Sequence, residues 1–124
     1  MDDAISSESI RLKRAYEPPA ASDGKRILVD RLWPRGVKKA AAAIDMWAKD
    51  IAPSTELRQW FGHETDRWDE FRRRYVAELE QKTDRINELR ALARSRPITL
   101  VFGAHDETHN DAVVLRKVLL RRHI

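Results

Sequence analysis

Two short apolar runs, separated by a long stretch with helical periodicity, constrain the fold of this chain most strongly. Residues 26–30 and 98–102 are rich in aliphatic residues and are flanked by turn-forming or polar residues, as is typical of buried strands. Strands joined by a long helical connection run parallel, so their carboxyl ends should share one edge of a sheet. Ligands of open α/β sheets bind at that edge.

Capping residues and apolar spacing divide the helical part of the chain into segments. The predicted helices are residues 40–49 (40–43 and 44–49, ending before Pro53), the segment from Ser54 to Gly62, a longer helix capped by Thr65, and a helix from Thr83 to Pro97. A last helix is predicted to begin near Thr108, which can form a capping box with Asp111.

A further strand is predicted at residues 10–16, where apolar and basic residues alternate. The nine residues that follow, 17–25, are too few for a helical crossover and favour a hairpin between the first two strands. We therefore expect a flexible N-terminus over residues 1–9 and a compact single α/β domain over residues 10–124. Its small, mainly parallel sheet should have about three or four short strands packed with several helices.

Composition narrows the class of protein. The 124 residues include no cysteine, which excludes disulfides, thiolate metal sites and a thiol nucleophile. No apolar run approaches the roughly 18 residues of a membrane span, and the acidic start lacks the features of a signal peptide, so we expect a cytoplasmic protein without membrane association. The net charge of +4 favours polyanionic partners, although 20 acidic residues interspersed with 24 basic ones mostly describe a solvated helical surface.

Two polar loops are predicted to meet at the carboxyl edge of the sheet. The first, residues 30–39, carries cationic side chains, an aromatic ring and a flexible glycine, which suit an anionic and aromatic ligand: Arg31, Arg35, Lys38, Trp33 and Gly36. The second, residues 103–110, leads into a helix N-terminus that attracts anions, near Thr108 and Asn110. Trp33 stacks on a ring of the ligand or plugs the core, and Asn110 binds the ligand or ties the loop down.

Three side chains in these loops are candidates for chemistry. Asp30 follows a buried strand directly and can act as a general base, a metal ligand or a hydroxyl acceptor, or can form a salt bridge that fixes the loop. His105 has a reference pKa that suits acid–base catalysis, and Asp106 lies beside it. A metal site that includes His109 has no defined ligand spacing, so we predict none. The sequence contains no GxGxxG, P-loop or GxSxG motif, and the cofactor is left unknown.

Three long strings in the chain resemble the short DUF488 proteins, the branch of bacterial YeaO-like proteins. They are residues 23–36 (DGKRILVDRLWPRG), residues 47–58 (WAKDIAPSTELR) and residues 99–104 (TLVFGA) leading to residues 109–115 (HNDAVVL). The match extends from Ile10 to Leu120 and implies a compact α/β domain whose function is not established. The second string adds Pro53, Ser54 and Arg58 as contributors to the pocket from a third loop.

These observations favour a protein that binds, or acts on, a small anionic ligand such as a nucleotide or phosphorylated metabolite at the carboxyl edge of the sheet. One alternative is an interaction protein that uses the loop around Trp33 at a subunit interface, for example in a homo-oligomer. Another is a nucleic-acid-binding module, suggested by the arginine content. No nucleophile and base can be paired, so the sequence leaves open whether the chain is an enzyme.

Overall fold

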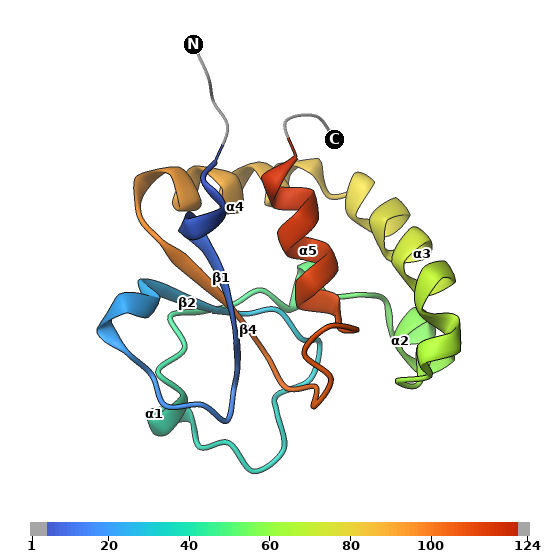
Figure 1. Cartoon of the computed structure of the whole chain (residues 1–124), viewed down its shortest axis with the longest axis horizontal. Helices are drawn as coiled ribbons and strands as arrows, with labels where there is room; N and C mark the ends of the chain where they lie inside the picture. Colours follow the sequence, from blue (N-terminus) through green and yellow to red (C-terminus); the bar gives the residue numbers. More distant parts are fainter. Residues whose placement is uncertain (1–4, 122–124) are drawn as a thin grey trace.

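The computed structural model describes residues 5–121 as a four-stranded sheet with helices around it (Figure 1). The α-helices and strands, in chain order, are β1 (Ile10–Arg14), β2 (Lys25–Leu28), α1 (Lys39–Ala42), β3 (Met46–Trp47), α2 (Thr55–Phe61), α3 (Trp68–Glu80), α4 (Thr83–Ser95), β4 (Ile98–Phe102) and α5 (Asp111–Leu120). Four 3₁₀ turns lie between them: η1 (Ser7–Ser9), η2 (Ala21–Asp23), η3 (Lys49–Ile51) and η4 (Thr65–Arg67). None of the helices in the described part of the chain is both long and apolar enough to cross a membrane.

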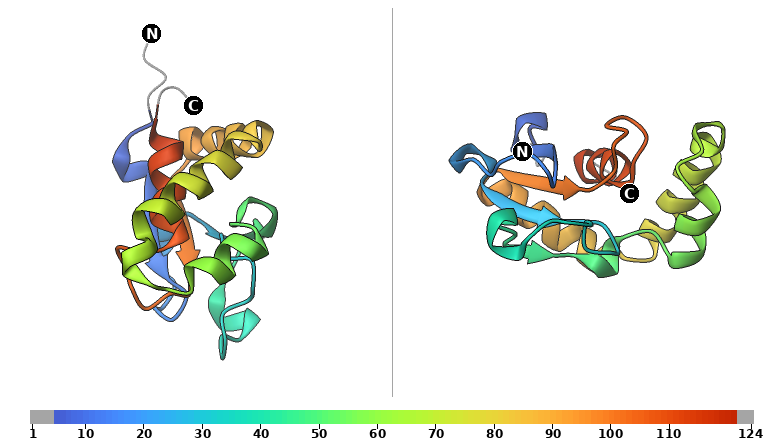
Figure 2. Two further views of the ribbon diagram at one scale, coloured as in Figure 1. Left: turned by 90° about the vertical axis from the view of Figure 1, so that its right-hand side faces the viewer. Right: turned by 90° about the horizontal axis from the view of Figure 1, so that it is seen from below.

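The sheet is entirely parallel, in the order β1-β4-β2-β3. The arrows of β2 and β4 point the same way in the right-hand view of Figure 2. This confirms the predicted α/β class and the parallel relation of the strands at residues 26–30 and 98–102. Their carboxyl ends lie at one edge, from which the two polar loops leave.

Both faces of the sheet are buried. On β4, Ile98, Leu100 and Phe102 belong to a large core shared with α2, α3, α4 and α5, whereas Val101 points to the other face. There Val101 packs in a smaller cluster with Leu28, against Trp33 and Trp47. Because both faces are covered, β4 is almost entirely apolar and β2 ends in the apolar residues Ile27 and Leu28, as the sequence indicated.

The predicted hairpin between the first two strands is wrong. β1 is paired with β4, with Ile10 opposite Ile98, so β4 separates β1 from β2. The intervening residues return along the sheet without an α-helix, with only the short 3₁₀ turn η2, and a mostly extended chain of this length spans that distance at about 3.3 Å per residue. Buried Asp23 fixes this crossover, because its carboxylate accepts from Lys13 on β1 (3.1 Å) and from Arg26 on β2 (2.7 Å).

The helix predicted at residues 44–49 is also wrong: only Lys39–Ala42 is helical, and Met46–Trp47 form an edge strand beside β2. The amide of Ala48 donates to the carbonyl of Leu28 (2.8 Å) and the Trp47 indole donates to the carbonyl of Asp30 (2.8 Å). These tertiary bonds override a weak local preference for helix.

The helix capped by Ser54 and closed by Gly62 is confirmed, since the Ser54 hydroxyl accepts from the Leu57 amide and Gly62 is left-handed. The caps predicted at Thr65 and Thr108 are wrong. Thr65 lies in a 3₁₀ turn before α3, and α5 is capped two residues later than expected, by Asn110. Of the flexible N-terminus predicted for residues 1–9, residues 1–4 lie outside the described residues, while Ser7–Ser9 form η1.

Candidate functional site

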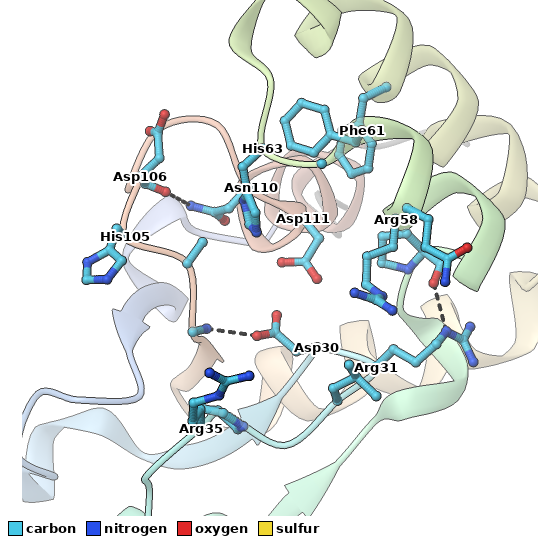
Figure 3. Close-up of a pocket in the computed structure, with 18 of the residues that line it drawn as sticks. Asp30, Arg31, Arg35, Arg58, Phe61, His63, His105, Asp106, Asn110 and Asp111 are labelled. Carbon is cyan, nitrogen blue, oxygen red and sulfur yellow. Dashed lines mark hydrogen bonds between the residues drawn. The ribbon is translucent and has the colours of Figure 1, made fainter.

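A pocket of about 680 Å³ opens at the carboxyl edge of the sheet, between the loop after β2, the loop after β4 and helix α2 (Figure 3). Six of the predicted site residues in the first two loops line it: Asp30, Arg31, Trp33, Arg35, His105 and Asp106. Arg58 and Asn110, from α2 and from the start of α5, line it as well. The structure therefore brings together residues from three separate segments of the chain.

Two aspartates lie face to face on the floor of the pocket (Figure 3). Asp30 lies in the loop two residues after the end of β2, and Asp111 is the first residue of α5. Their carboxyl groups are close enough to hydrogen-bond with each other. Each is also held by the main chain: the Gly103 amide donates to Asp30 Oδ2 (2.8 Å) and the Ala112 amide donates to Asp111 Oδ1 (2.8 Å). The pair is thus fixed in position by backbone at both ends.

The two carboxyl groups cannot both be ionised easily. Burial raises the pKa of Asp30, and the amide of Gly103 offsets only part of that effect. Burial raises the pKa of Asp111 well above its usual range, and the neighbouring charge of Asp30 raises it further. Two interacting acids in one site titrate as a pair, so this pair retains one shared proton over a pH range in which isolated aspartates have lost theirs.

Arginine side chains surround this acid pair. Arg35 and Arg58 reach toward it from two sides of the pocket, and neither guanidinium has a hydrogen-bond or ion-pair partner within residues 5–121 (Figure 3). Arg31 differs, because its Nε donates to the carbonyl of Pro53 (2.9 Å) and so joins the first loop to the segment before α2. Two free guanidinium groups in one pocket can bind a phosphate or a carboxylate.

The remaining walls are largely aromatic. Phe61 and Phe71 stack with their centroids 4.3 Å apart, and Trp33 is half-buried with its indole N–H bonded to the carbonyl of Val37 (2.7 Å). Trp33 packs edge-on against Trp47 on the second core cluster, so it both plugs that core and lines the pocket. The hydroxyl of Tyr16 at the rim donates to the carbonyl of Arg35 (2.9 Å), which holds the first loop in place.

The loop after β4 is stiffened by Asp106. Its Oδ1 accepts from the amides of Thr108 (2.9 Å) and His109 (3.0 Å), and its Oδ2 lies 2.9 Å from His109 Nδ1. These bonds, those to backbone amides first, lower the pKa of Asp106 below its usual range. Asp106 is therefore an ionised loop-forming residue, which does not suit the acid–base role considered for it.

Asn110 and His105 also have structural partners. The Asn110 side chain is buried, accepts from the Val113 amide (3.1 Å) and donates to the carbonyl of Asp106 (2.8 Å), so it ties the loop to α5. His105 is exposed at the rim, with Nδ1 3.3 Å from a guanidinium nitrogen of Arg14. Four further predicted contributors lie outside the pocket lining: Gly36, Lys38, Ser54 and Thr108. Ser54 is engaged by Glu78, with the two side-chain oxygens 2.6 Å apart.

Sequence reasoning missed several polar residues of the pocket, among them Asp111 and His63. The sequence predicted Asp111 in a capping box, although an acid at the start of the helix after a rim loop belongs to the same edge of the sheet as Asp30. His63 follows the left-handed Gly62, has φ +60° itself and lines the pocket. No group of three or more side chains suited to holding a metal ion occurs among the described residues.

Relatives of the chain carry no functional description. It is 49% identical over 107 residues to the Uncharacterized protein YeaO of Escherichia coli K12, a match that covers 86% of this chain and 93% of the relative. It is 40% identical over 110 residues to the Uncharacterized protein Rv3073c of Mycobacterium tuberculosis H37Rv, with 89% and 92% covered. No solved structure matches it. The family DUF488-N3i, described as "Inactive DUF488-N3 subclade", matches residues 9–123. The chain therefore belongs to the YeaO-like branch of the DUF488 family, within the subclade DUF488-N3i.

Proposed function

We propose that this protein binds a small anionic organic molecule, a nucleotide or a phosphorylated metabolite, in the pocket at the carboxyl edge of the sheet. The observation that carries the proposal is the pair of guanidinium groups of Arg35 and Arg58, which face the pocket without a partner in the described chain. Guanidinium groups pair with phosphate or carboxylate in a planar, bidentate manner, and such charge-assisted bonds are among the strongest in proteins.

Binding rather than catalysis is the role that we infer. The subclade is described as inactive, and the candidate acid–base residues have structural partners, His105 with Arg14 of β1 and Asp106 with the amides of its own loop. The pocket size supports a ligand of metabolite dimensions, since small-molecule sites commonly measure roughly 300–1,000 Å³.

The test is a calorimetric titration of wild-type protein, Arg35→Ala and Arg58→Ala with inorganic phosphate, ribose 5-phosphate and adenosine monophosphate. Each substitution should weaken binding at least about tenfold, because a lost hydrogen bond to a charged group costs roughly 1.5–3 kcal/mol. Arg73→Ala is the matched control: Arg73 is exposed on α3 and pairs with Glu70, so this variant has the same change of charge and should bind as wild type does.

Two results would oppose the proposal. If none of these anions binds, the pocket is not an anion site. If Arg73→Ala weakens binding as much as the pocket variants do, the attraction comes from net charge and not from this site.

A subunit interface formed by the same loop is a second candidate, favoured by one observation. Leu32, next to Trp33, is 58% exposed, and Tyr16, which also lines the pocket, is 49% exposed. Light scattering of wild type and Leu32→Ser decides between the candidates: a dimer that dissociates in the variant supports the interface, and a monomer in both removes it.

A further inference from the structure

Anion binding alone leaves the acid pair Asp30 and Asp111 unexplained. Two carboxyl groups at the floor of a pocket repel an anion, and neither has a salt-bridge partner within residues 5–121. The fold gains no ion pair from them, although burying two acids side by side costs free energy. Buried acids with that cost and no ion-pair partner in the described chain point to a role in recognition.

The hydrogen-bonding capacity of the pair identifies the kind of group that it recognises. One oxygen of each acid is occupied by a main-chain amide, of Gly103 for Asp30 and of Ala112 for Asp111. The shared proton lies in the hydrogen bond between the two acids, so the lone pairs that remain on the pair are acceptors. A hydroxyl group donates one hydrogen bond and carries no charge, so two neighbouring hydroxyls can donate to the pair without adding net charge.

An ammonium group fits less well at the same position. It carries a positive charge, and here it would lie near the guanidinium groups of Arg35 and Arg58, which face the pair (Figure 3). A metal ion would need more ligands than two carboxylates, and the described residues supply no such cluster.

We propose that the ligand is an organic phosphate with two neighbouring hydroxyl groups, such as a pentose phosphate or a ribonucleotide. Its hydroxyls bind Asp30 and Asp111, its phosphate binds Arg35 and Arg58, and the apolar face of its sugar or base packs on Trp33 or on the Phe61–Phe71 stack. This inference rests on the proposed anion-binding function and adds to it the part of the ligand that the acids select.

The experiment is an NMR titration of ¹⁵N-labelled full-length protein with ribose 5-phosphate, 2-deoxyribose 5-phosphate and inorganic phosphate. The deoxy sugar lacks one of the neighbouring hydroxyls, so it should bind at least about tenfold more weakly than ribose 5-phosphate, and phosphate should bind more weakly still. The Gly103 amide donates to Asp30 Oδ2, so its resonance should move with ribose 5-phosphate and much less with phosphate alone. Asp111→Asn should abolish the preference for the ribose compound but should not weaken the binding of phosphate, because it removes an acid that repels the anion. Asp30→Asn provides a second variant if Asp111→Asn does not fold.

The outcomes separate the two proposals. Equal affinities for the ribose and deoxyribose compounds, with Arg58→Ala weakening both, overturn the hydroxyl inference and leave the anion site standing. No binding of any of the three overturns both proposals. A preference for ribose that persists in both aspartate variants also overturns the inference, because the hydroxyls would then be bound elsewhere.

Discussion

Among single residues of the pocket, some polar side chains form hydrogen bonds that hold the fold, and others have no partner in the described chain. Asn110 and Asp106 have structural partners for their side-chain polar groups, whereas Arg35 and Arg58 have none in the described chain. Asp111 is only partly satisfied. One of its oxygens accepts a hydrogen bond from a main-chain amide, but the neighbouring charge of Asp30 disfavours its ionised form. Polar groups that lack a partner, or that lie beside a like charge, are the ones that point to a ligand.

The acid pair should lower the stability of the ligand-free protein at neutral pH. Both pKa values are raised in the folded state, so the folded protein binds protons more tightly than the unfolded chain does. Their contribution to stability is therefore complete below the ordinary aspartate pKa of 3.8 and is lost as the pH rises through the raised values.

Asp111→Asn removes this opposition and should raise the free energy of unfolding at pH 7 by on the order of 1 kcal/mol, a usual gain when a functional site is relieved. It should also flatten the fall in stability between pH 4 and 7. Urea denaturation across this pH range measures both effects. Asp66→Asn, at an exposed position in η4, is the control and should change little. A variant destabilised at every pH would instead give Asp111 a structural role.

At the scale of the element, helix starts and turns carry most of the local information in the chain. The sequence predicted α2 with its cap at Ser54 and its end at Gly62, because both signals lie in a short segment and depend on few other residues. It placed the start of α5 at Thr108, since Thr108 and Asp111 have capping-box spacing. In the structure Thr108 bonds to Asp106 instead, and the helix begins after Asn110.

The position of this cap can be tested directly. Asn110→Ala removes both the cap to Val113 and the bond to the carbonyl of Asp106, and should lower the free energy of unfolding by about 1–2 kcal/mol. Thr108→Ala alters an exposed side chain and should stay within about 0.5 kcal/mol of wild type. Thermal unfolding of the two variants gives the comparison. The reverse order would restore Thr108 as the cap.

Two turns with positive φ provide a second matched pair. Gly24 has φ +63°, and a Cβ there would lie 2.0 Å from the carbonyl oxygen of Pro97, so Gly24→Ala should cost several kcal/mol, of the order of 3 or more. Gly36 has φ +78°, and a Cβ there would have nothing within 4 Å, so Gly36→Ala should cost only the backbone penalty of roughly 1 kcal/mol. Chemical denaturation compares them. Equal costs would mean that the approach of Pro97 to Gly24 is not a constraint.

At the scale of the whole molecule, the strand order β1-β4-β2-β3 makes every pairing parallel and most of them distant in sequence. Ile10 pairs with Ile98 and Leu28 with Val101, so the two ladders of β4 join segments that lie far apart in the sequence. The pocket depends on this order, because it places the loops after β2 and β4 beside each other.

Such non-local pairing should make folding slow. The chain loses the entropy of closing long loops before the stabilising contacts between distant strands can form, so we expect refolding in roughly the millisecond-to-second range. Stopped-flow fluorescence is suited to the measurement because the chain contains four tryptophans. Refolding in microseconds, as in small helical bundles, would contradict the importance of the distant strand pairs.

The features that could be predicted from the sequence alone are those encoded within short segments. These are the cores of β2 and β4, their parallel relation through a long helical connection, the two polar rim loops, and the position of Asp30 at the end of a buried strand. Periodicity and turn residues encode them, and few distant residues can change them. The tertiary structure was needed to show that β1 lies on the far side of β4, that residues 46–47 form a strand, and that Asp111 and His63 line the same pocket as Asp30. Those outcomes depend on which distant segments pack best against one another, and that competition is settled by the whole chain at once.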